Sequence, residues 1–287
     1  MSRVWYPAPA KLNLGLRLVG RRDDGYHLLQ TVFQIIDLCD ELAFEPSSDG
    51  QVSRALVEGP QAAAIEAVDS SQDLCVRAAL ALRAATGVSA GVRIHLRKNI
   101  PLGGGLGGGS SDAATTLCVL DRVWGTALGV ERLAELALPL GADVPVFVRG
   151  RSAVGEGVGE KLTPIELPPA CYVVVHPGVP VATRDVFQAP ELTRNSAILT
   201  IRALLASGDL NDCEPVVRAR VPEVAAALDW LGGFATARLT GTGACIYARF
   251  ASADTAAEVV RKVPQPWRAW VVQGLSESPL LRRLEEL

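Results

Sequence analysis

Apolar and polar residues alternate along the first part of the chain. Leucine occupies every second position from residue 12 to residue 18, with Lys11 and Asn13 among the polar residues between. A period of two predicts a half-buried β-strand over residues 10–19. On the later strand 92–96, the same alternation places His95 on the polar face and predicts a surface position. The other predicted strands are residues 31–36, 40–44, 172–175, 235–239, 244–250 and 268–272.

Apolar residues at spacings of three and four predict helices between these strands. The helix at residues 74–85 has Asp73 as a plausible N-cap and Gly87 just beyond its end. A second helix, at residues 111–124, ends before Gly125. Further helices are predicted at residues 130–138, 196–206, 223–231 and 253–263. Because helices and antiparallel strands mix in both halves of the chain, we predict an α+β fold.

A change in composition suggests two domains. Glycines at positions 155, 157 and 159 precede prolines at positions 164, 168 and 169, and segments of this kind often separate domains. A chain of 287 residues is long enough for two modest domains. We therefore expect an N-terminal domain of residues 1–155 and a C-terminal domain of residues 156–287.

Charge and composition narrow the class of partner. The formal net charge is −3, whereas nucleic-acid binders usually carry a basic excess, so we expect no nucleic-acid partner. No run approaches about 18 apolar residues, and the N-terminus lacks the apolar segment of a signal peptide, so we expect no membrane span. The six cysteines form no Cys-x-x-Cys pair, which favours free thiols in the cytoplasm. The three histidines lack the spacing of a zinc site, and we assign no metal ligands.

The most unusual segment is a glycine run between a predicted strand and a predicted helix. Six of the seven residues 103–109 are glycine, although glycine loses the most backbone entropy on folding. Many glycines let a backbone approach a ligand closely, and the N-terminus of a helix favours anions. Ser110 or Ser111 is expected to cap the helix. The run therefore predicts a phosphate-binding loop, and a flexible linker is the weaker alternative.

Two common phosphate motifs fit this run poorly. The Walker motif requires a lysine before its final Ser or Thr, but Gly109 precedes Ser110. A Gly-x-Gly-x-x-Gly pattern exists at positions 103, 105 and 108. A dinucleotide-binding domain also needs an acidic residue at the end of a second strand, and the nearest candidate, Asp121, falls inside the following helix. A dehydrogenase is therefore disfavoured.

Spaced motifs along the chain resemble those of the GHMP kinases. They are residues 8–14 (Ala-Pro-Ala-Lys-Leu-Asn-Leu) with 24–27 (Asp-Gly-Tyr-His), the glycine segment 102–114, residues 141–145 (Gly-Ala-Asp-Val-Pro) and residues 239–245 (Leu-Thr-Gly-Thr-Gly-Ala-Cys). The resemblance covers nearly the whole chain in order. It implies an N-terminal domain like the second domain of ribosomal protein S5, a ferredoxin-like C-terminal domain, and an active site in the cleft between them.

The resemblance also implies an activity. It suggests transfer of the γ-phosphoryl group of ATP, with Mg²⁺, to the 2-hydroxyl of a cytidine diphosphate-linked methylerythritol in isoprenoid precursor biosynthesis. The protein would be a monomer or a weak homodimer. A homoserine- or mevalonate-type kinase is the alternative within the family, and a nucleotide-binding regulator on a degenerate kinase fold is the alternative outside it.

The resemblance assigns catalytic roles to Lys11 and Asp143. Asp143 would orient the substrate hydroxyl and accept its proton, while Lys11 would steady the carboxylate and the developing negative charge. Asn13, two residues along the same strand, would share the site. The residues alone leave two alternatives open: Asp143 could be a helix N-cap ahead of Pro145, and Lys11 could be a solvated strand lysine.

The ATP side is expected to follow the glycine loop. The implied residues are Lys98, Pro101, Gly103, Gly104, Gly105, Leu106, Gly107, Gly108, Gly109, Ser110 and Ser111. Lys98 would lie on the adenine side. The chain departs from the family at Asp73, where relatives commonly carry asparagine, and an ionised carboxylate cannot donate to adenine. Asp112, where relatives often carry asparagine, is not assigned as a Mg²⁺ ligand.

The substrate side is expected to need an aromatic platform and an anion site. Tyr26, His27 and Phe187 match the family at the cytidine end, with Thr183 nearby, although Phe187 could simply belong to the core. Gly241, Thr242 and Gly243 would face the substrate phosphates from a turn whose N–H groups form an anion nest. A plain hairpin turn fits this segment equally well.

Overall fold

The structure, a computed structural model, describes residues 3–206 and 210–286 as an α+β fold built on a sheet of ten strands. The main strand order is β3-β4-β2-β10-β7-β9-β8, while β1 pairs with β2 and β5 lies between β2 and β6. The strands are β1 (Tyr6–Arg21), β2 (His27–Ser47), β3 (Val52–Glu58), β4 (Gly91–Arg97), β5 (Ala153–Glu156), β6 (Lys161–Pro164), β7 (Cys171–His176), β8 (Ala237–Leu239), β9 (Ile246–Phe250) and β10 (Arg268–Leu275).

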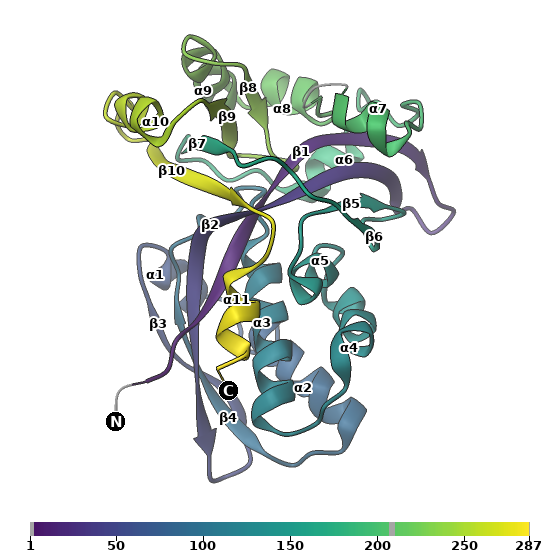
Figure 1. Ribbon diagram of the computed structural model, residues 1–287, viewed down its shortest axis with the longest axis vertical. Helices are drawn as coiled ribbons and strands as arrows, with labels where there is room; N and C mark the ends of the chain where they lie inside the picture. The colour runs from purple at the N-terminus through teal and green to yellow at the C-terminus, as the bar shows by residue number, and fades with distance from the viewer. Residues whose placement is uncertain (1–2, 207–209, 287) are drawn as a thin grey trace.

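The helices are divided between the two ends of this sheet (Figure 1). Toward the lower end in the view lie α1 (Ala62–Glu66), α2 (Leu74–Thr86), α3 (Gly108–Val123), α4 (Gly129–Ala137), α5 (Val144–Arg149) and α11 (Pro279–Leu284), with the short 3₁₀ helix η1 (Leu138–Leu140) after α4. Toward the upper end lie α6 (Thr183–Gln188), α7 (Ile201–Ala206), α8 (Glu214–Arg220), α9 (Pro222–Gly232) and α10 (Ala253–Val260).

The antiparallel pair β1 and β2 runs through both ends of the molecule (Figure 1). Tyr6 and Ala8, at the start of β1, belong to a core shared with α2, α3 and α5. Leu16 and Leu18, at its other end, belong to a core shared with β7, α8 and α9. Between them, Ala10 and Leu12 belong to a third core, so one strand carries Lys11 and Asn13 through the region between the first two cores.

The predicted strands at residues 31–36 and 40–44 are one continuous strand, β2. The intervening residues 37–39 do not interrupt it, because Cys39 and Asp40 stay paired with Pro9 and Ala8 of β1, and Asp37 accepts a hydrogen bond from the backbone N–H group of Gln273. Helix α11, from the end of the chain, packs Leu280 and Leu284 into the first core. The division at residues 155 and 156 remains a prediction.

Helix α2 confirms the predicted caps, whereas α3 starts differently. Asp73 accepts hydrogen bonds from the N–H groups of Cys75 and Val76, and Gly87 adopts a left-handed φ of 73° at the C-cap. The start of α3 is at Gly108, with Gly107 as its N-cap at φ 72° and no side-chain cap among the described residues. The predicted serine cap is therefore wrong, because the tight turn at Gly107 starts the helix three residues earlier.

Two further predictions are wrong. His95 is only 4% exposed, although Arg93, two residues away on the same face of β4, is exposed; the His95 ring is held against the Glu45 side chain. Its Nε2 atom lies 3.1 Å from the Glu45 carboxylate on β2. The helix predicted at residues 196–206 begins only at Ile201, because Ser196 and Leu199 bond instead to Leu18 and Gln30.

Two findings bear on the expected environment of the chain. All six cysteines are free thiols. Within the described ranges, no helix is long and apolar enough to cross a lipid bilayer.

Candidate active site

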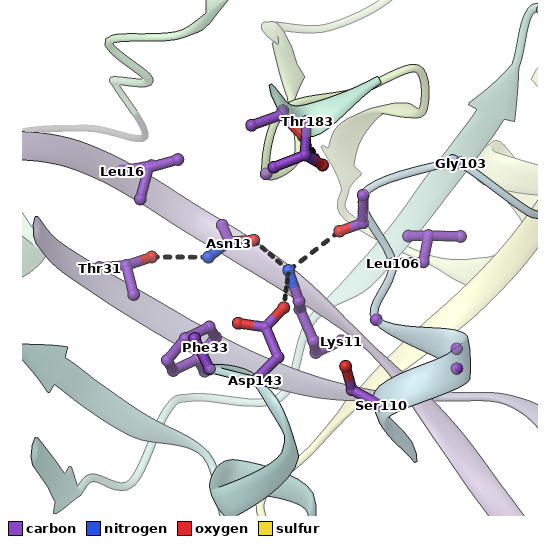
Figure 2. Close-up of a pocket in the computed structure, with 18 of the residues that line it drawn as sticks. Lys11, Asn13, Leu16, Thr31, Phe33, Gly103, Leu106, Ser110, Asp143 and Thr183 are labelled. Atoms are coloured by element: carbon purple, nitrogen blue, oxygen red, sulfur yellow. Dashed lines mark hydrogen bonds and ion pairs between the residues drawn. The ribbon is translucent and has the colours of Figure 1, made fainter. Parts of the chain in front are cut away.

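A cavity of about 420 Å³ lies where the glycine loop, β1 and the start of α5 meet (Figure 2). Its walls bring together segments from both ends of the chain. The predicted site residues that line it are Lys11, Asn13, Lys98, Pro101, Gly103, Gly104, Gly105, Leu106, Gly107, Gly108, Gly109, Ser110, Asp143, Thr183, Phe187, Gly241 and Thr242.

Lys11 and Asp143 form an ion pair inside this cavity. The Lys11 Nζ atom lies 3.3 Å from the Asp143 carboxylate, and Lys11 is only 3% exposed. The same ammonium donates to the Asn13 Oδ1 atom and to the Gly105 carbonyl, at 3.0 Å for the latter (Figure 2). Lys11 is therefore not a solvated strand lysine, since three oxygen atoms fix its position.

Asp143 stands at the N-cap position of α5, but its side chain caps no N–H group in the described structure. The carboxylate instead faces Lys11 and is about one-third exposed. This geometry leaves one carboxylate oxygen available to a ligand in the cavity. A buried cation beside a partly exposed carboxylate suits the orientation and deprotonation of a hydroxyl group.

Asn13 lines the cavity, and its side chain also fixes the position of the Lys11 ammonium. Its amide nitrogen donates to the Thr31 hydroxyl at 2.8 Å, which orients the amide oxygen toward Lys11. Its backbone N–H donates to the Thr240 hydroxyl at 2.9 Å. Asn13 therefore links the β1–β2 pair to the Thr240–Gly243 turn.

The glycine loop is fixed through its carbonyl groups, and its packing explains several of its glycines. The carbonyls of Gly103 and Gly104 accept hydrogen bonds from the N–H groups of Ala244 and Cys245. A Cβ atom on Gly105, whose φ is 72°, would lie 2.2 Å from the Thr240 carbonyl oxygen. No side chain larger than hydrogen fits there, so the loop packs directly on the turn.

The loop presents N–H groups to the cavity at the start of α3. The first bond within the helix runs from the Ser111 N–H to the Gly107 carbonyl. The N–H groups of Gly108, Gly109 and Ser110 precede it, so the helix itself does not use them. These residues line the cavity, and the combination makes an anion site.

Ser111 and Lys98, both predicted to contact ATP, are buried. Ser111 is fully buried, and its hydroxyl has no hydrogen-bond partner among the described residues. Lys98 lies under the loop with its ammonium between the carboxylates of Asp40 and Asp112. Burial raises the pKa of the Asp112 carboxyl well above its usual range. These contacts support the loop from beneath.

Asp73 is occupied by structural contacts. Besides capping α2, its carboxylate bonds to the Arg54 guanidinium at 2.8 Å. Leu74, the next residue, lines the cavity. The Asp73 carboxylate is therefore used by the start of α2 and by Arg54.

A second cavity, of about 670 Å³, adjoins the first. Tyr26, His27 and Phe187 line it, as predicted for one binding region. The rings of His27 and Phe187 are stacked, with centroids 5.0 Å apart and planes inclined by 18°. Phe187 lies on α6 and not in the irregular stretch expected. The residues common to both cavities are Leu29, Ala142, Val158, Thr183 and Phe187.

The Thr240–Gly243 turn is a hairpin connection that also borders the first cavity, and its phosphate-binding role remains a prediction. It joins β8 and β9, which pair antiparallel, so it is a hairpin connection. Gly241 and Thr242 also line the first cavity, while Gly243 is not among its lining residues. The Thr242 and Thr183 hydroxyls lie 2.9 Å apart, which connects the turn to α6.

Several residues of the site were not predicted. Thr31 and Phe33, on β2, lie beside Lys11 and Asn13 (Figure 2). Their strand was predicted, but the register between β1 and β2 that brings them to the site is visible only in the structure. Arg194, whose guanidinium contacts His27, lies in a stretch without periodicity and gave no signal.

Comparisons with known proteins agree with this geometry. A model of the N-terminal domain of GHMP kinases matches residues 73–151, and a model of the GHMP kinase C-terminal domain matches residues 189–269. A crystal structure of a 4-(cytidine 5'-diphospho)-2C-methyl-D-erythritol kinase is 35% identical, with a TM-score of 0.77 over 95% of this chain and 100% of the other. The mevalonate kinase of Methanococcus jannaschii, at 14% identity and a TM-score of 0.68 over 96% and 99%, shares the fold.

Two curated relatives have a higher sequence identity to this chain than these crystal structures do. The 4-diphosphocytidyl-2-C-methyl-D-erythritol kinase of Nitrosococcus oceani is 52% identical over 98% of both chains. That of Ectopseudomonas mendocina is 53% identical over 98% of this chain and 94% of the relative. The chain therefore belongs to the GHMP kinase family, and within it to the family of the 4-diphosphocytidyl-2-C-methyl-D-erythritol kinases. The predicted α+β fold and family resemblance are confirmed.

Proposed function

We propose that this chain transfers the γ-phosphoryl group of ATP to the 2-hydroxyl of 4-(cytidine 5'-diphospho)-2-C-methyl-D-erythritol, in the non-mevalonate isoprenoid pathway. The products are the 2-phosphate and ADP. Family membership supports ATP as the donor and the cytidyl substrate as the acceptor. The observation that carries the proposal is the Lys11–Asp143 pair, which lies between the start of α3 and a second cavity lined by aromatic rings.

Asp143 and Lys11 have different roles in the phosphoryl transfer. The substrate hydroxyl oxygen forms a bond to the γ-phosphorus while the bond from that phosphorus to the β–γ bridging oxygen breaks. The hydroxyl proton passes to the Asp143 carboxylate, and the bridging oxygen leaves with ADP. Lys11 holds the carboxylate in place and places a positive charge near the transferred group.

The donor phosphates lie against the N-terminus of α3. The N–H groups of Gly108, Gly109 and Ser110 bind phosphate oxygens there, aided by the helix dipole. The Lys11 ammonium pairs with the Gly105 carbonyl, so that this acceptor of the loop does not face the anion unpaired.

Mg²⁺ is the expected counter-ion of the ATP phosphates. The lining of the cavity fits this ion, because the Ser110 hydroxyl offers an oxygen ligand beside the start of α3, and Mg²⁺ in such sites is held by one or two protein oxygens plus phosphates. Ser110 would hold it, while the Asp143 carboxylate is kept for the substrate hydroxyl. When bound, Mg²⁺ neutralises phosphate charge.

The cytidine end lies in the second cavity. Tyr26, His27 and Phe187 provide ring faces for the base. Thr183, Gly241 and Thr242 line the first cavity between this end and the Lys11–Asp143 pair. Homoserine and mevalonate carry no base, so the aromatic cavity favours the cytidyl substrate over those acceptors.

A panel of acceptors tests the proposal. Coupled ADP release is measured with the cytidyl substrate, homoserine, mevalonate and no acceptor. We expect turnover with the cytidyl substrate at a rate at least about a hundredfold above the others, since the base supplies binding energy only in that case. Turnover with homoserine or mevalonate and none with the cytidyl substrate would overturn the assignment.

A further inference from the structure

Arg194 contacts His27 and Phe187, which line the second cavity, but does not line the cavity itself. It follows α6 in the chain, and its guanidinium donates four hydrogen bonds. The Nε atom donates to the His27 Nε2 atom at 3.1 Å. The two terminal nitrogens donate to the backbone carbonyls of Phe187 at 2.9 Å, Ala189 at 2.6 Å and Leu192 at 2.9 Å.

These bonds join the two stacked rings of the cavity. His27 begins β2, whereas Phe187 lies on α6, so the rings come from opposite ends of the sequence. Arg194 contacts the ring of one residue and the carbonyl of the other. A planar guanidinium with fixed donor directions can hold both at once.

The bond to His27 also determines where the ring proton lies. Because the Nε2 atom accepts from Arg194, the neutral imidazole carries its proton on Nδ1. His27 lines the second cavity. The ring therefore offers a donor to a ligand, as a base carbonyl or ring nitrogen requires.

We propose that Arg194 is a positioning residue for the cytidine end: it fixes His27 as the Nδ1–H tautomer and holds Phe187 against it, so that the base site is formed before substrate binds. This inference rests on the proposed function for the identity of the ligand. Arg194 acts through His27 and Phe187 and has no place among the residues that line either cavity.

The charged groups around His27 agree with a neutral ring. They are Arg21 on β1, Asp24 in the turn, Arg184 on α6 and Arg194. Burial, then Arg194 and Arg21, lower the pKa of His27. Protonation would place a further positive charge beside Arg194 and Arg21 and break the Arg194 bond. The stability that this contact contributes to the folded state is therefore present above the ordinary histidine pKa of about 6.5 and is lost as the pH falls.

Nitrogen NMR of the three histidines tests the tautomer directly. In the wild-type protein at neutral pH, we expect His27 to show a protonated Nδ1 and an unprotonated Nε2. In Arg194→Ala, we expect it to shift toward the Nε2–H form, which free histidine prefers. Arg220→Ala is the matched control, since Arg220 bonds to Glu191 near the same segment and does not contact His27. A wild-type His27 protonated on Nε2 would overturn the proposal.

Steady-state kinetics then separate positioning from folding. We expect Arg194→Ala to raise the KM for the cytidyl substrate about tenfold, through the lost hydrogen bonds, with the KM for ATP and kcat nearly unchanged. Arg194→Lys keeps the charge but not the planar fork, so it should recover little of this KM. An unchanged KM in Arg194→Ala, or full recovery in Arg194→Lys, would contradict the proposal. Absence of wild-type turnover with the cytidyl substrate would instead refute the proposed function and leave the NMR result standing.

Discussion

The Lys11 ammonium contacts both the Asp143 carboxylate, at 3.3 Å, and the Gly105 carbonyl, at 3.0 Å. One buried cation therefore joins the residue proposed to receive the substrate proton to the loop proposed to bind phosphate. Removing it would disturb both at once. The relative position of acceptor hydroxyl and donor phosphate depends on this side chain, because phosphoryl transfer is governed by positioning and charge.

Replacement of Lys11 by methionine tests this connection. Lys11→Met keeps the apolar stem and removes the ammonium, so we expect kcat to fall by about 10² to 10³. The change is measured as coupled ADP release at saturating substrates. The thermal midpoint of unfolding is the control, and it should stay within a few degrees of the wild type. A kcat within about threefold of the wild type would show that the ammonium is dispensable.

Substitution at Gly105 tests the contact between loop and turn. A Cβ atom there meets the Thr240 carbonyl oxygen at 2.2 Å, and φ is 72°. We expect Gly105→Ala to lower the free energy of unfolding by at least about 2 kcal/mol, measured by denaturant titration. Gly232→Ala is the matched control, because a Cβ atom there meets no atom within 4 Å. Equal stability of the two variants would contradict the tight packing.

The buried cluster of Lys98, Asp40 and Asp112 predicts opposite effects for two substitutions. Lys98→Met leaves the buried Asp40 carboxylate and the buried Asp112 carboxyl without their shared ammonium and should cost about 3–5 kcal/mol of unfolding free energy. Asp112→Asn retains an acceptor for Lys98 and should be no less stable than the wild type at pH 7. Chemical denaturation of both variants measures the difference.

The same cluster gives a pH dependence. Burial holds the pKa of Asp112 above its unfolded value, so the native state keeps a proton that the unfolded state releases. Wild-type stability therefore falls, relative to Asp112→Asn, as the pH rises above the ordinary aspartate pKa of about 3.9. The two stability curves should meet near pH 4. A constant difference from pH 4 to pH 7 would rule out a raised pKa.

We expect Phe187 to contribute to binding of the cytidyl substrate but not of ATP. Phe187→Ala should raise the KM for the cytidyl substrate about tenfold and leave the KM for ATP nearly unchanged, because it removes a ring face from the second cavity. Phe250→Ala is the matched control, since Phe250 packs on the same core but lines neither of the two cavities. Equal effects on both KM values would mean that Phe187 serves the core.

Local signals in the sequence predicted the elements that depend on local interactions. Helix α2 has a capping aspartate, Asp73, and a left-handed glycine, Gly87, and both act as expected. The glycine loop was predicted from its composition because its conformation needs glycine at Gly105 and Gly107. The family motifs then pointed to Lys11 and Asp143, which the structure places in contact.

Features that depend on distant strands were not predictable in this way. His95 alternates as a surface residue would, but the pairing of β4 with β2 brings the Glu45 side chain against its ring. In the sequence, Lys98 is simply a lysine that precedes the predicted phosphate-binding loop. Only the fold shows that its ammonium contacts Asp40 and Asp112. Arg194 is similar, since its role depends on bonds to His27 and to carbonyls at the end of α6. The roles assigned to individual site residues remain predictions.

Asp143→Asn provides the most direct test of the central claim, that Asp143 receives the proton of the cytidyl substrate. The carboxamide preserves shape but cannot accept this proton, so we predict that kcat for ADP release with the cytidyl substrate falls at least about a hundredfold. Both substrates should still bind, as measured by calorimetry. Turnover by Asp143→Asn within about threefold of the wild-type rate would contradict the account.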